Sequence, residues 1–277
     1  MLPGLLLAFR EGLEAALIVG IVLGILQKLQ HPDRARIVWL GTLSAIILSL
    51  LIALGLTALG AELEGPAEEL FEGFTMLLAA LVLTWMIFWM QRQGRTVRQG
   101  LEMQMRQAIS SNQTGELFWV PFVAVLREGI ELALFLTAAV MASSAQQTWI
   151  GGLIGLVLAG AVAWGVFATT IRLDVRQFFQ VTGAILLVFA AGLLARGIHE
   201  FVEVGWLPAL VEHVWNTAVI LDDQSTLGQV ARSLLGYRSS PSLAELIAYV
   251  GYLATVLVLL WRASRAPSLV VTEHNNA

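Results

Sequence analysis

Two short stretches place charged side chains inside otherwise apolar segments. Residues 8–20 read AFREGLEAALIVG and residues 125–136 read VLREGIELALFL, so each contains an Arg-Glu-Gly-x-Glu motif. On a helix, glutamates three residues apart share a face, and an arginine four residues before the second glutamate is close enough to pair with it. Oxygen donors suit hard cations, and the motif contains neither Cys nor Met, which argues against soft metals. The motif therefore predicts cation binding on a helix.

The two motifs together hold four carboxylates and two guanidinium groups, namely Glu11, Glu14, Glu128, Glu131, Arg10 and Arg127. One charged residue at the centre of a membrane helix costs about 2.5–3.5 kcal/mol on insertion scales, so all six require pairing or hydration. Four glutamates against two arginines leave a surplus of negative charge, which protonation of a carboxylate or a bound cation would offset. The alternative is that the ion pairs only hold helices together; two copies of the motif favour a bound cation.

The elements that must position these residues are long apolar segments. Of the 277 residues, 57% are hydrophobic and only 13% are charged, whereas about 25% are charged in an average soluble domain. This composition predicts an all-α, polytopic membrane protein. Seven segments are long enough to cross a bilayer as helices, at about 2–27, 37–61, 70–91, 117–142, 148–171, 177–198 and 244–262.

Composition also excludes several classes of protein. The chain has no cysteine, so it has neither disulfides nor thiolate metal sites nor Cys-based catalysis. A formal net charge of −4 gives no sign of a nucleic-acid partner. The first apolar segment lacks a basic leading region and contains Arg10, so we interpret it as a retained helix and not a cleaved signal sequence.

Charged residues outside the apolar segments predict the orientation. Eleven of the sixteen Lys and Arg residues lie in four segments, 28–36, 92–106, 172–176 and 262–265. The connections between these basic segments are acidic, with five glutamates over 60–73 and six acidic residues over 199–245. By the positive-inside rule, the N-terminus lies outside and the C-terminus lies in the cytoplasm. Seven crossings of the cytoplasmic membrane agree with this assignment.

The doubled motif indicates an internal repeat. A shift of 117 residues carries the first motif onto the second, and three membrane segments separate the copies. Because three is odd, the copies enter the membrane in opposite directions. Residues 71–75 and 178–182 form a weaker match. We therefore expect an inverted repeat of three plus three helices, over about 1–92 and 117–198, which is typical of transporters that bind their substrate near the midplane.

The expected domain organisation is simple. A single transmembrane domain spans residues 1–262, with an outer connection at 199–243 and a seventh helix at 244–262. Short helices are expected along the outer connection. A solvated helix is expected in the inner loop 93–116. Residues 263–277 are expected to form a disordered cytoplasmic tail.

Two outer features could collect cations. Glu72 lies beside aromatic residues at the start of the third segment, and it is expected to reach toward the conduction path. The sixth segment ends in His199, Glu200 and Glu203, where a helix would offer nitrogen and oxygen ligands together. This stretch is not the zinc-protease motif His-Glu-x-x-His, because position 203 is Glu. We name Glu72, His199, Glu200 and Glu203 the outer access site; the alternative is ordinary surface chemistry.

Paired Arg-Glu-Gly-[Leu/Ile]-Glu motifs in the first and fourth of seven helices resemble the oxidase-dependent iron transporter family. That family contains the yeast-type high-affinity iron permeases and their bacterial EfeU-type relatives. The resemblance covers about residues 1–262, and the stretch from His199 to Glu203 is similar to the His-Glu-x-x-Glu sequence of the bacterial members.

The resemblance implies a permease, not an enzyme, that moves iron as Fe(III) after an external ferroxidase or iron-donor protein has supplied it. Fe(II) is the other form that such a site could receive. It also implies that Glu11, Glu14, Glu128 and Glu131 bind the ion and that Arg10 and Arg127 are the motif arginines. No bound cofactor is expected, since iron is the cargo. The oligomeric state is not predicted.

Two alternatives to iron transport stay open. The cargo could be another cation, such as Mn(II), Pb(II) or the proton, because the residues themselves predict only a cation. The chain could instead be an intramembrane di-iron oxidase with Glu-x-x-Glu on two helices. Helical di-iron centres use Glu-x-x-His pairs, and both motifs here lack the histidine.

Overall fold

Seven long helices make up most of the protein in the computed structural model, which describes residues 1–93, 103, 114–168, 175–222 and 225–265. They are α1 (Leu2–Lys28), α2 (Ala35–Glu62), α3 (Pro66–Gln93), α5 (Thr114–Ala142), α6 (Ala145–Ala168), α7 (Val175–Glu203) and α9 (Leu243–Arg265). A 3-10 helix η1 (Pro32–Arg34) and the short helix α8 (Thr226–Leu235) complete the helical elements, and the described residues include no strand.

Each predicted membrane segment overlaps one long helix, but several helices extend further than predicted. Helix α3 begins at Pro66 instead of residue 70, and α7 ends at Glu203 instead of residue 198. The reason is that apolar patterning marks the part of a helix suited to lipid, whereas hydrogen bonding continues into the polar ends. The expected short helix of the outer connection is α8. The inner loop and the tail lie mostly outside the described residues, as do the basic residues at 95, 98, 106 and 172.

Five of the long helices are long and apolar enough to cross a membrane: α2 together with η1, α3, α6, α7 and α9. The other two, α1 and α5, are 27 and 29 residues long. Each carries the three charged residues of a motif within its apolar stretch. The helices with the charged motifs are therefore the two that composition alone does not mark as membrane spans.

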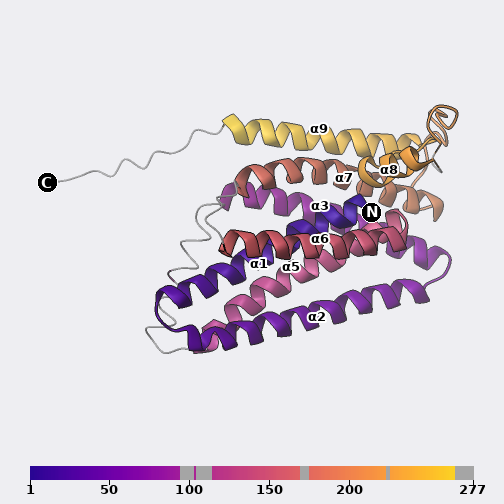
Figure 1. The fold of residues 1–277 in the computed structure, drawn as a ribbon. Coiled ribbons are helices and arrows are strands. Elements are labelled where there is room, and N and C mark those ends of the chain that lie inside the picture. The colour runs from indigo at the N-terminus through magenta and orange to yellow at the C-terminus, as the bar shows by residue number, and fades with distance from the viewer. Residues whose placement is uncertain (94–102, 104–113, 169–174, 223–224, 266–277) are drawn as a thin grey trace, which may run out of the picture.

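The first three long helices have their main partners among the later ones. Helix α1 packs mainly on α6, α2 on α5, and α3 on α7. Figure 1 shows the long helices side by side, with α2 and α9 at opposite edges of the bundle. The first half contains α1, α2 and α3, and the second half contains α5, α6 and α7. If these helices correspond in that order, the contact α1–α6 corresponds to the contact α5–α2. The two halves are thus interleaved and not separate bodies.

Contacts at glycines show the direction of these pairs. Along α1, Gly4, Gly12 and Gly20 face Thr148, Ala159 and Phe167 in turn, so α1 and α6 run parallel. Along α2 and α5, Gly41 faces Phe118 and Ser49 faces Gly129, so these two helices also run parallel. Helices α3 and α7 run antiparallel, because Gly73 meets Gly197 and Phe201 whereas Ile87 meets Gly183.

Small residues allow the close approach of α1 and α6. A Cβ atom at Gly155 would lie 2.8 Å from the backbone nitrogen of Phe9 and would also collide with the carbonyl of Leu5. Helix α2 presents a similar buried face of small residues to α5: Gly41, Thr42, Ala45 and Ser49. Small residues let membrane helices pack backbone against backbone, where van der Waals contact replaces the hydrophobic effect.

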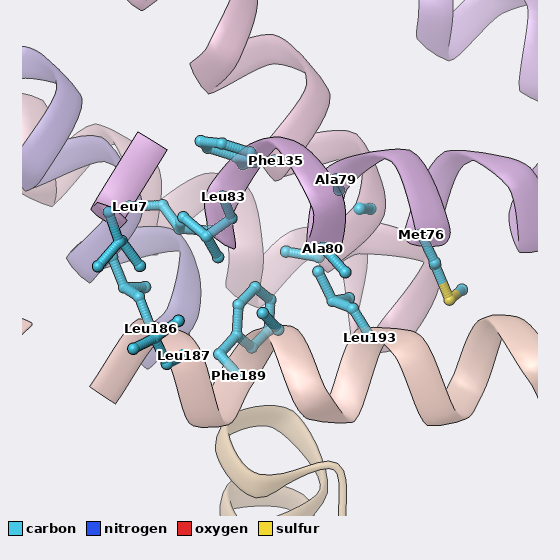
Figure 2. Close-up of a cluster of buried hydrophobic side chains, with 14 of the residues drawn as sticks. Leu7, Met76, Ala79, Ala80, Leu83, Phe135, Leu186, Leu187, Phe189 and Leu193 are labelled. Atoms are coloured by element: carbon cyan, nitrogen blue, oxygen red, sulfur yellow. The ribbon is translucent and has the colours of Figure 1, made fainter. Parts of the chain in front are cut away.

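The largest apolar core lies between α3, α5 and α7. Figure 2 shows Leu83 and Ala80 of α3 against Phe189 and Leu193 of α7, with Phe135 of α5 beside them. All five side chains are buried. This core fixes the position of α3. The C-terminal end of α3 contacts the arginines of both motifs.

Gly155→Leu should destabilise the protein by about 1–3 kcal/mol or prevent its assembly, because the added side chain meets the backbone of α1. The measurement is the thermal unfolding midpoint of the purified protein in detergent. Gly160→Leu is the matched control on the same helix, since a Cβ atom there meets no atom within 4 Å. Equal unfolding midpoints for the two variants would contradict the packing of α1 on α6.

Candidate cation site

Both motifs lie in the middle of their helices. Glu14 is the thirteenth of the 27 residues of α1, and Glu128 is the fifteenth of the 29 residues of α5. The two helices contact each other directly. Their directions are opposite, because Leu7 near the start of α1 packs with Phe135 and the later part of α1 packs with Leu117. The motifs therefore meet from opposite directions at half the length of each helix.

Each motif arginine pairs with glutamates of its own motif. Arg10 Nη1 donates to Glu11 Oε1 at 2.9 Å, and its Nη2 lies 3.1 Å from Glu14 Oε1. Arg127 Nε donates to Glu131 Oε1 at 2.8 Å. The spacing of four residues predicts the Arg10–Glu14 and Arg127–Glu131 pairs, and the structure contains both.

Three of the four motif glutamates converge. Carboxylate oxygens of Glu11, Glu128 and Glu131 lie within 4.8 Å of one another, and all three residues are buried. Among the described residues, the Oε2 atom of each has no hydrogen-bond partner. A buried, unpartnered carboxylate oxygen is costly, and three carboxylates that come this close together offer oxygen ligands suited to a hard cation.

Glu14 does not belong to this group of three. Its carboxylate stays beside Arg10, and its side chain is 11% exposed, more than that of the fully buried Glu11. Its charge still acts on Glu131 and Arg127 across the helix interface. The expected convergence of four carboxylates is therefore observed for three, because the rotation of α1 against α5 brings Glu11, and not Glu14, to Glu128 and Glu131.

Helix α3 holds both motif arginines, which the sequence did not reveal. Arg10 donates to the sulfur of Met86 at 3.3 Å and to that of Met90 at 2.7 Å. The guanidinium carbon of Arg127 lies 4.6 Å from the centre of the Trp89 ring. Such cation–π contacts are strongest where water is excluded. The Met and Trp residues look like ordinary apolar residues in the sequence, so no local pattern indicates this role.

The glycine of each motif provides space for a neighbouring helix. A Cβ atom at Gly12 would lie 3.1 Å from the Cβ of Ala159 on α6. A Cβ atom at Gly129 would collide with the side chain of Ser49 on α2. Both glycines therefore lie where a neighbouring helix approaches closely. The faces of α1 and α5 that pack on α6 and α2 thus hold the two motifs in place.

The outer access site is a chain of close polar contacts. His199 Nε2 lies 2.8 Å from Glu203 Oε1, and His199 Nδ1 lies 3.1 Å from Glu245 Oε1. Glu200 lies 3.9 Å from Arg196, and its charge and that of Arg196 act on Glu72. Glu245 comes from α9, and its pairing with His199 could not be inferred from the motif because 46 residues separate them.

The residues of the outer access site do not converge as the motif glutamates do. Among the described residues, the group Glu11, Glu128 and Glu131 is the one set of three potential ligands whose ligand atoms come together. His199 is engaged on both ring nitrogens, and Glu203 is half exposed. Whether Glu72, His199, Glu200 and Glu203 receive a cation stays a prediction.

A bundle of long helices, five of them long and apolar enough to cross a membrane, is typical of a multi-pass membrane protein. Comparison with known proteins agrees. Residues 1–270 match the iron permease FTR1 family, so the chain belongs to that family and is a transporter, not an enzyme. The di-iron oxidase alternative is thereby set aside.

Relatives cover nearly the whole chain. The ferrous iron permease EfeU of Yersinia pestis is 33% identical over 263 residues, which are 94% of this chain and 93% of the relative. The ferrous iron permease EfeU of Escherichia coli O157:H7 is also 33% identical over 263 residues, covering 94% of this chain and 95% of the relative. No solved structure matches this chain at a significant level.

Trp89→Leu should reduce iron uptake by about threefold or more, because it removes the ring that faces Arg127, a contact worth up to about 2 kcal/mol when desolvated. Trp89→Phe keeps an aromatic face and should retain most of the uptake. Uptake of radioactive iron by cells with equal amounts of each variant in the membrane is the measurement. Equal losses in both variants would show that the aromatic face is unimportant.

Proposed function

We propose that this protein carries iron inward across the cytoplasmic membrane and that Glu11, Glu128 and Glu131 bind the ion in transit. The observation that supports this proposal is the set of three buried carboxylates with unpartnered oxygens between α1 and α5. Oxygen-only ligands suit Fe(III), a hard cation. These carboxylate oxygens would replace the water molecules bound to the ion as it passes the centre of the membrane.

Glu14 would act with the three converging glutamates. It lies next to Arg10 and within electrostatic reach of Glu131. A small rotation of α1 relative to α5 would exchange Glu14 and Glu11 at the group of ligands. Arg10 and Arg127 orient the carboxylates and limit the net negative charge, so that the site remains tolerable inside the membrane when no iron is bound.

Seven crossings with the N-terminus outside and the C-terminus inside form the proposed topology. The parallel pairs α1–α6 and α2–α5 favour an inverted repeat, since each helix of one pair corresponds to a helix of the other. In such repeats the substrate site lies where the halves meet. Movement of one repeat against the other, or protonation of a glutamate, would then release the ion to the cytoplasm.

Iron would reach the site from the end of the bundle that carries the outer access site. Glu72 and Glu200 lie close enough to influence each other, and they come from α3 and α7, which flank the central core. An external ferroxidase or iron-donor protein would supply Fe(III) there. The relatives are named ferrous iron permeases, and oxidation of Fe(II) outside the membrane would reconcile that name with Fe(III) at the oxygen ligands.

Glu131→Ala and Glu14→Ala should each reduce iron uptake at least tenfold while leaving the protein in the membrane. The physical reason is the loss of one carboxylate from the central group or from the Arg10 pair beside it. Glu64→Ala, at an exposed position between α2 and α3, is the control and should retain nearly full uptake. The measurement is uptake of radioactive iron, normalised to the amount of protein in the membrane. Normal transport by both test variants would refute the assigned roles.

The form of the cargo can be tested with the purified protein in sealed vesicles. We expect uptake of Fe(III), kept soluble by a weak chelator, to exceed uptake of Fe(II) held reduced by ascorbate, because the ligands are carboxylates alone. Mn(II) and Pb(II) belong in the same series, and Glu131→Ala vesicles supply the background. Faster uptake of Fe(II), or of either other metal, would reject Fe(III) as the transported ion.

A further inference from the structure

A second polar site lies far from the motifs, at the end of the bundle where α7 ends and α9 begins. A pocket there is enclosed by the end of α5, by α7, by α8 with the loop that follows it, and by the start of α9. Three arginines line it, Arg196, Arg232 and Arg238, together with the single carboxylate of Glu245. Figure 1 shows α8 lying against α7 at this end, on the side where α9 begins.

The pocket depends on a contact between two glycines. A Cβ atom at Gly192 of α7 would lie 2.7 Å from the Cα of Gly236, so backbone meets backbone at this point. Gly236 ends α8 with a φ of +67°, a conformation that glycine adopts without the strain a side chain would bring. This contact holds α8 against α7 and directs Arg232 and Arg238 toward Arg196.

The arginines of the pocket have more donors than partners. Arg196 Nη1 donates to the carbonyl of Ala142 at 2.9 Å, but Arg196 Nε and Arg232 Nε are buried without a hydrogen-bond partner. Arg238 reaches Glu245 only at 3.4 Å. The other oxygen of Glu245 already accepts from Ser242 and lies beside His199. Glu200, 3.9 Å from Arg196, is the other carboxylate nearby, and two carboxylates do not match three guanidinium groups.

The charges of Arg232 and Arg238 repel that of Arg196, and the charges of Glu200 and Glu72 oppose this repulsion in part. Three like charges around one cavity repel each other, and partly buried groups are screened less by salt than exposed ones. Guanidinium groups bind carboxylate and phosphate oxygens through planar pairs of hydrogen bonds. We propose that this pocket is a binding site for a small oxyanion, with Arg196, Arg232 and Arg238 as its donors.

The size of the pocket limits the ligand. Its free volume is about 20 Å³, whereas one water molecule requires about 10–15 Å³ measured in this way. The pocket thus has room for about one oxygen of a phosphate group, whose remaining atoms would lie at the opening of the pocket, and it excludes a large chelate. That phosphate could be free in solution or could belong to the headgroup of an anionic lipid, because the pocket lies at the end of the membrane-spanning helices.

The test is the thermal unfolding of the purified full-length protein in detergent, with potassium phosphate replacing potassium chloride at constant ionic strength. Phosphate should raise the unfolding midpoint of the unchanged protein in a saturable manner. Arg232→Gln should weaken the apparent phosphate affinity at least tenfold, and Arg232→Lys should weaken it less. Arg36→Gln, which removes an exposed arginine of α2, is the control and should respond as the unchanged protein does.

A second measurement separates the two sources of phosphate. The same variants are unfolded in nanodiscs of phosphatidylcholine alone and of phosphatidylcholine with phosphatidylglycerol, without free phosphate. Stabilisation by phosphatidylglycerol that Arg232→Gln abolishes would identify a lipid headgroup as the ligand. Stabilisation by free phosphate alone would identify the soluble anion. An equal response of Arg232→Gln and the unchanged protein in both experiments, or no response of either, would overturn the proposal.

Discussion

Pairing of charges in the middle of two apolar helices is the constraint on which this structure depends. Arg10 is only 1% exposed, and lipid offers no partner for a guanidinium group there. It pairs with Glu11 and Glu14, but among the described residues Arg10 Nε and several motif carboxylate oxygens have no hydrogen-bond partner. Contact between α1 and α5 keeps those oxygens away from lipid, where they would have no partner. The proposed cation site thus follows from how the motif charges are accommodated.

Interleaving of the two halves provides the rigidity that this arrangement needs. Helix α1 packs on α6 and α5 packs on α2, so each motif helix is held by a helix of the other half. Glycine in the middle of each motif allows that contact, because any side chain there would separate the helices. If one half moves against the other during transport, the motifs must move with it.

Arginines are used differently in the two polar regions of the protein. At the centre, Arg10 and Arg127 are outnumbered by carboxylates and are held by the thioethers and the indole ring of α3. At the α8 end, Arg196, Arg232 and Arg238 outnumber the one carboxylate that lines their pocket. The first region favours a cation and the second an anion. Glu200, a member of the outer access site, lies 3.9 Å from Arg196 of the arginine pocket.

The sequence by itself determined the seven long helices and the pairing within each motif, because hydrophobic length and the i to i+4 spacing are local properties of a helix. It also indicated the family through the doubled motif. Only the tertiary structure decided that Glu11, and not Glu14, joins Glu128 and Glu131, since this depends on how α1 is rotated against α5. The hydrogen bond from Arg10 to Met86 and the pairing of His199 with Glu245 likewise could not be inferred from the sequence. These partners lie 76 and 46 residues apart, and packing of whole helices brings them together.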